Sequence, residues 1–92
     1  MTQQYIVGQF SVLLEDLHPL PGEWTSAVRE LRREVESCPA SMLPRLAHEA
    51  VSLTDMICWS AIERGDVRGF GSYAKSAAAL GEFIDDARLV DE

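Results

Sequence analysis

Apolar residues recur at intervals of three and four along almost the whole chain, and this rhythm is the feature that most constrains its fold. Such spacing places apolar side chains on one face of an α-helix, whereas a half-buried strand alternates at every second residue, a pattern that this chain does not sustain. Glycines and prolines interrupt the rhythm at residues 18–22, 38–39 and 64–66. The sequence therefore predicts four helices joined by three short connections.

The interruptions and the capping residues predict helices at about residues 3–17, 23–37, 42–64 and 67–87. Pro19 ends the first helix because it drives the preceding residue out of the α region. We expect Ser41 to cap the third helix and Asp66 the fourth, since both residue types accept a hydrogen bond from a free N–H group of the first turn. Gly65 fits the left-handed position that ends the third helix.

Each predicted helix has one apolar face that can contribute to a shared core. These faces contain Ile6, Phe10, Leu13 and Leu17; Trp24, Val28, Leu31, Val35 and Cys38; Leu43, Leu46, Ala50, Leu53, Ile57 and Ser60; and Phe70, Tyr73, Ala77, Leu80, Ile84 and Ala87. Three further residues of the third helix lie beside its face: Ala47, Thr54 and Ala61. The fourth helix also has a stripe of small residues, which lets a neighbouring helix come close.

These patterns predict an all-α fold in which residues 1–92 form one helical domain with a short acidic C-terminal tail. We expect a four-helix bundle of up-down-up-down antiparallel connectivity, because short connections place successive helices side by side. The long third helix is expected at the centre, paired with the fourth.

The charge of the chain restricts its partners. There are 15 acidic and 8 basic residues, for a net charge of −7. A field of this sign repels nucleic acid and anionic membrane surfaces, so we expect neither as a partner, and a basic protein partner is favoured. The acidic tail is expected to fray and aid solubility, with docking of a basic partner as the alternative.

The sequence also predicts a cytoplasmic location. Its first residues lack the basic leader and apolar run of a secretory signal, and no apolar run is long enough to cross a bilayer. Cys38 and Cys58 are isolated, which is typical of a reducing compartment, although the sequence leaves a single bridge between them open.

One stretch contains the residue types of a catalytic site. His48, Ser52 and Asp55 share a face of the third predicted helix. In a hydrolytic triad the histidine bridges the serine and the acid, but here the serine stands between the other two, which lie about 10.5 Å apart along the helix axis. We interpret the trio as a polar, solvated face and predict no catalytic residues.

The sequence predicts no metal and no cofactor. Glu15 and His18 form a single Glu-x-x-His pair, whereas a di-iron bundle needs two such pairs on different helices. The tripeptide at residues 64–66 reads Arg-Gly-Asp, and its structural role as helix end, left-handed glycine and cap accounts for it fully.

Three large apolar residues are predicted to lie outside the apolar faces: Met56 and Trp59 on the third helix, and Phe83 on the fourth. Methionine and aromatic residues are enriched at protein interfaces. These residues favour a small, acidic, non-catalytic protein–protein interaction module, either homo-oligomeric or a regulatory partner of another protein; a homodimer fits this pattern. The alternative for Trp59 is that another helix of the bundle covers it.

The second functional hypothesis is a small-molecule-binding or accessory enzyme domain with a pocket inside the bundle. Its candidate lining residues are Trp24, Thr54, Cys58, Ser60 and Tyr73. For Thr54 and Ser60, the commoner arrangement is a hydroxyl bonded back to the carbonyl four residues earlier.

Overall fold

The computed structural model of the chain describes residues 3–15 and 22–89. Within these ranges all regular structure is helical and no β-strand is formed. The helices are α1 (Gln3–Glu15), α2 (Gly22–Ser37), α3 (Leu43–Glu63) and α4 (Val67–Asp86), with a short 3₁₀ turn, η1 (Ala40–Met42), before α3. The prediction of an all-α fold is confirmed.

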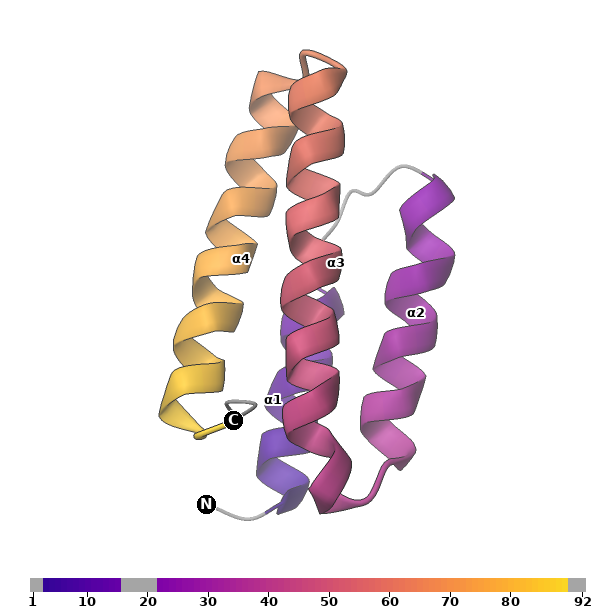
Figure 1. Cartoon of the computed structure of the whole chain (residues 1–92), viewed down its shortest axis with the longest axis vertical. Coiled ribbons are helices and arrows are strands. Elements are labelled where there is room, and N and C mark those ends of the chain that lie inside the picture. Colours follow the sequence, from indigo (N-terminus) through magenta and orange to yellow (C-terminus); the bar gives the residue numbers. More distant parts are fainter. Residues whose placement is uncertain (1–2, 16–21, 90–92) are drawn as a thin grey trace.

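The four helices of the described ranges run alternately up and down in Figure 1. In that view α3 stands in front, α4 and α2 lie on either side of it, and α1 lies behind its lower half. The most extensive packing joins α3 to α4 and α1 to α2, and α2 also meets α3 while α1 meets α4. The predicted antiparallel bundle, with the long third helix paired to the fourth, is therefore confirmed.

The turn between α3 and α4 forms as the sequence predicts. Gly65 adopts a φ of +72°, the left-handed conformation that glycine tolerates best. Its N–H donates to the Ile62 carbonyl at 3.0 Å and the Asp66 N–H donates to the Ala61 carbonyl at 2.9 Å, the two bonds of a Schellman motif. The Asp66 carboxylate then accepts a hydrogen bond from the Gly69 N–H at 2.9 Å and caps α4.

The start of α3 differs from the prediction. Ser41 lies inside η1 rather than at a cap, because the 3₁₀ turn leads directly into the helix. Met42 occupies the N-cap position, and no side chain provides a cap hydrogen bond there. Pro44 lies in the first turn, where its missing N–H leaves no hydrogen bond unmade. The predicted roles of Leu17 and Pro19 lie outside the described residues.

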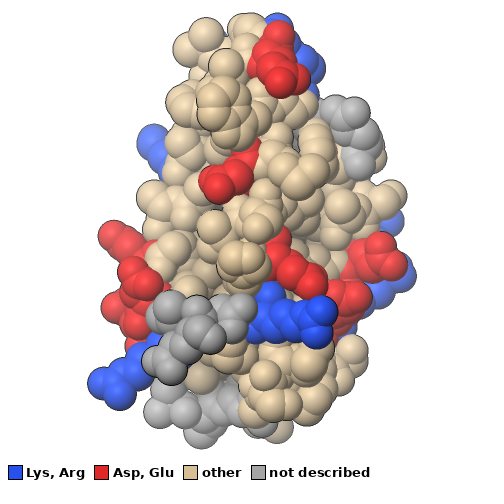
Figure 2. Space-filling view, viewed as in Figure 1, with Lys and Arg blue, Asp and Glu red and all other residues tan. Residues whose placement is uncertain are grey.

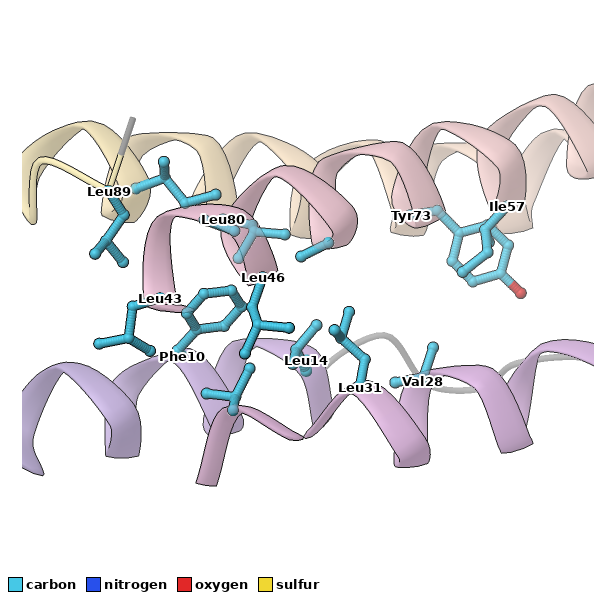
Figure 3. Packing of buried hydrophobic residues seen from close by; sticks show 14 of the residues in the cluster. Phe10, Leu14, Val28, Leu31, Leu43, Leu46, Ile57, Tyr73, Leu80 and Leu89 are labelled. Atoms are coloured by element: carbon cyan, nitrogen blue, oxygen red, sulfur yellow. The ribbon is translucent and has the colours of Figure 1, made fainter. Parts of the chain in front are cut away.

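Charged and apolar side chains separate between surface and interior. Acidic and basic groups lie on the outside of the molecule (Figure 2), while one apolar cluster fills the space between the helices (Figure 3). In Figure 3 the ring of Phe10 lies near Leu43 and Leu46, and Tyr73 lies beside Ile57 further along the bundle. The cluster consists of Phe10, Leu14, Val28, Leu31, Val35, Leu43, Leu46, Ala47, Ala50, Ile57, Ala61, Tyr73, Leu80, Ile84 and Leu89.

The buried face of α3 is shifted from the one predicted, whereas the buried residues of α4 lie on the predicted face and Phe70 alone of that face is exposed. On α3, Ala47 and Ala61 are fully buried, whereas Leu53 and Ser60 are only half-buried. Burial of these alanines fits the close packing of α3 on α4, since a small side chain allows a short distance between two helices. Phe70, predicted to face the core, is exposed because it lies in the first turns of α4, at the end of the bundle that α1 does not reach (Figure 1).

Candidate interaction surface

Exposed apolar side chains gather at one end of the molecule. Of the eight large apolar residues that are exposed in the described ranges, six lie between residues 51 and 70: Val51, Met56, Trp59, Ile62, Val67 and Phe70. In Figure 2 uncharged side chains cover much of the upper half of this view, while most charged side chains lie over the lower half and the edges. We call Met56, Trp59, Ile62, Val67 and Phe70 the apolar tip.

The structure places Met56 and Trp59 on the outward face of α3. Trp59 is 64% exposed and Met56 is 54% exposed. The two residues are one turn apart on the same helix, so their side chains are neighbours on its surface. Trp59 therefore lies in solvent, and the alternative in which another helix of the bundle covers it does not apply within the described residues.

Phe83 lies in a different environment from the other two predicted interface residues. It is half-buried against the core, and its ring meets that of Phe10 edge to face, with the centroids 6.2 Å apart and an angle of 71° between the planes. Such aromatic pairs stabilise a core beyond their buried area. Phe83 joins α4 to α1, and we leave it out of the candidate surface.

His48, Ser52 and Asp55 are all exposed on the outward face of α3. No hydrogen bond joins these three side chains to one another in the described part of the chain. They lie along the same outward surface of α3 that carries Met56 and Trp59.

The five residues predicted to line an internal pocket differ in their burial and in their contacts. The Thr54 hydroxyl donates to the Ala50 carbonyl at 2.7 Å, the arrangement expected for a buried threonine in a helix. The Ser60 hydroxyl instead accepts a hydrogen bond from Arg64 Nη1 at 2.6 Å. Among four surface grooves lined wholly by described residues, Tyr73 lines one of about 370 Å³, beside Asp66, and none is lined by two of the five.

Trp24 lies at the edge of the core. The residue is half-buried on α2, and its indole Nε1 is buried with no hydrogen-bond partner among the described residues. An unpaired indole N–H in an apolar site is unfavourable.

A groove between α1 and α2 is a feature that the sequence reasoning missed. It has a volume of about 550 Å³ and is lined by Gln4, Val7, Gly8, Ser11, Val12, Arg32, Glu36 and Cys38. Ser11 is only 5% exposed, and its hydroxyl has no hydrogen-bond partner within the described ranges. Arg32 joins α2 to α1 at this groove through an ion pair with Glu15 at 3.4 Å, and it pairs with Glu36 of its own helix at 3.2 Å. The only signal in the sequence was a serine beside the apolar residues of the first helix.

Both cysteines are free thiols, so the bridge that the sequence left open is not formed. Burial raises the pKa of the Cys38 thiol, which also donates to the Val35 carbonyl at 3.4 Å. Burial likewise raises the pKa of Cys58, and the negative charge of Asp55 adds to the rise. Both thiols therefore stay protonated and weakly nucleophilic at neutral pH.

The described residues show neither a metal site nor a membrane-spanning helix. No group of three or more His, Cys, Asp or Glu side chains there is arranged to hold a metal ion. None of the described helices combines the length and the apolar character needed to cross a membrane.

Comparison with known proteins does not assign this chain to a family. No protein-family model, no curated protein and no solved structure matches this chain.

Proposed function

We propose that this chain is a non-catalytic protein–protein interaction module that binds another protein chain through the outward face of α3, centred on Trp59 and Met56. The observation that carries the proposal is the 64% exposure of Trp59, the second of the five residues of the apolar tip along the chain. Tryptophan is among the residue types most enriched at the energetic centres of protein interfaces.

Burial of this surface by a partner is energetically favourable. An aromatic side chain covers on the order of 150–250 Å², and burial of apolar area gives about 25 cal/mol per Å². Covering the exposed part of Trp59 alone is therefore worth on the order of 3 kcal/mol before the costs of association. The bundle has a core of its own and does not use this energy for folding.

The surface is also held in place before binding. Met56, Trp59 and Ile62 lie on a helix of 21 residues that packs along α4, and they span about 9 Å along its axis. A partner binds such a surface without first ordering its backbone, so little of the interaction energy is lost to entropy.

The proposal is tested by affinity capture from the native host with three forms of the purified chain: the wild type, Trp59→Ala, and the control Val12→Ala. Val12 is an exposed apolar residue on α1, outside the apolar tip. We expect the wild type and the control to retain one defined protein that Trp59→Ala does not retain. The purified wild-type chain should also bind that protein directly when the two are mixed. Equal retention by all three forms would contradict the proposal.

A further inference from the structure

The outward face of α3 carries a stripe of residues whose spacing reads the same in both directions. Its members follow one another at intervals of four, three, four, three and four, so the stripe is symmetric about residue 54. All six side chains are exposed: Arg45, Glu49, Ser52, Met56, Trp59 and Glu63. Intervals of this kind keep a stripe on one side of a helix and allow a second helix to pack along it.

From this spacing and the opposite charges at its two ends, Arg45 and Glu63, we infer that the partner of the surface is a second copy of this chain, with the two α3 helices packed antiparallel about a two-fold axis near residue 54. The inference rests on the function proposed above, because it names the partner of the same surface. Symmetric dimers use one patch on both subunits, so the patch must be complementary to itself when it is reversed.

The two ends of the stripe are complementary in charge. Arg45 and Glu63 are 18 residues apart, which is five full turns, so they project from the same side of α3 about 27 Å apart. Neither makes an ion pair within the described part of the chain. In the antiparallel arrangement Arg45 meets the partner's Glu63, and the pair occurs twice. In a parallel arrangement each residue would face its own like charge.

The middle of the stripe is complementary in size and in hydrogen bonding. Ser52 is small and lies opposite the partner's Met56, so the larger side chain covers the smaller one. Glu49 lies opposite the partner's Trp59, where its carboxylate accepts a hydrogen bond from the indole N–H. The contact thus has Ser52 and Met56 of both copies at its centre, Trp59 and Glu49 on either side of them, and ion pairs at both ends.

Asp55 opposes the dimer locally and makes its register testable. Asp55 lies on the flank of the stripe, one residue from the symmetry centre, so the same register brings it beside the partner's Asp55. Two exposed carboxylates at this separation repel each other weakly in salt. Asp55→Asn removes that repulsion and is expected to tighten the dimer.

The inference is tested by sedimentation equilibrium of the full chain over a range of concentrations. The variants are Arg45→Glu, Glu63→Arg and the double reversal. We expect each single reversal to weaken the dimer about threefold or more, since two ion pairs become repulsive, and the double reversal to restore it. Trp59→Ala is expected to weaken the dimer at least about tenfold.

A matched control separates the local contact from the overall charge. Arg29→Glu changes the net charge by the same amount as Arg45→Glu, at an exposed position on α2, and is expected to alter association less. Circular dichroism shows that the variants fold. A wild-type chain that stays monomeric up to about 1 mM, or a double reversal no tighter than the single ones, would overturn the inference.

The outcomes distinguish this inference from the proposed function. If the wild type stays monomeric while Trp59→Ala abolishes the capture of a different protein, the second-copy inference fails and the proposed function stands. If the wild type is monomeric and captures no protein through Trp59, both fail.

Discussion

The two ends of the bundle differ in the exposure of their apolar side chains. At the lower end α1 fills the space between the other helices, and Phe10 is completely buried. At the upper end the apolar tip extends beyond α1, and Phe70 is 37% exposed while Trp59 is mostly in solvent. The same helical rhythm therefore builds a core at one end and an uncovered surface at the other.

On α3, the residues that stabilise the fold and the residues of the candidate interaction surface lie on different faces. The buried residues of α3 run from Leu43 to Ala61 on its inner face, so the helix is anchored along its whole length. Its exposed apolar residues are concentrated in the second half. Substitutions at the two ends of the bundle should therefore separate effects on stability from effects on association.

We expect the largest difference in stability between substitutions of two phenylalanines, one at each end of the bundle. Phe10→Ala should lower the free energy of unfolding by about 3–5 kcal/mol, because it leaves a cavity in the core and removes the ring that Phe83 contacts. Phe70→Ala should cost less than about 1 kcal/mol, since the side chain is already partly in water. Urea unfolding followed by circular dichroism gives both values, and equal losses would break the comparison between the two ends.

Two isoleucines on α3 show the same contrast between buried and exposed positions within one helix. Ile57 is fully buried, and Ile62, five residues later, is exposed. We expect Ile57→Ala to cost about 2–5 kcal/mol and Ile62→Ala to change stability by about 0.5 kcal/mol or less. A loss for Ile62→Ala as large as that for Ile57→Ala, measured by urea unfolding, would mean that the apolar tip is part of the folding core.

The cap between the two helices of the tip should have an intermediate effect. Asp66→Ala removes the hydrogen bond to the Gly69 N–H and should lower stability by about 1 kcal/mol. Asp66→Asn is the control, because asparagine caps helices about as well as aspartate. Thermal unfolding of the three forms measures the difference, and an Asp66→Ala protein as stable as the wild type would rule out the cap as a determinant of the turn.

The smallest effect is expected from pH. Because the thiol pKa values of Cys38 and Cys58 are raised in the folded chain, the folded state holds these protons more tightly than the unfolded one. Their contribution is fully present below the unfolded pKa of about 8.5 and is lost as the pH rises through the folded values. Urea unfolding between neutral and alkaline pH should therefore show stability falling less steeply in a Cys38→Ser/Cys58→Ser variant than in the wild type. The same slope in both would contradict this assignment.

The features that could be predicted from the sequence are those that local chemistry determines. Gly65 and Asp66 act within one turn of their own positions, so their roles as helix end and cap were predictable. The rhythm of α2 places Val28, Leu31 and Val35 inward, and all three are buried.

Features that depend on distant parts of the chain were harder to predict. Phe70 has the spacing of a core residue, but its exposure depends on where α1 ends. The spacing of Phe83 predicts a position beside the apolar face, but Phe10 of α1 packs against its ring. The unpaired hydroxyl of Ser11 depends on the packing between α1 and α2, which no local pattern encodes.

The central claim is that Trp59 is exposed in the single chain and becomes covered by a second chain. Trp24→Phe leaves Trp59 as the only tryptophan, since the chain has two, and acrylamide quenching of its fluorescence then reports on this one side chain. We predict strong quenching in dilute solution and progressive protection as the protein concentration rises. Protection already present in the monomer, or quenching that does not change with concentration, would contradict the claim.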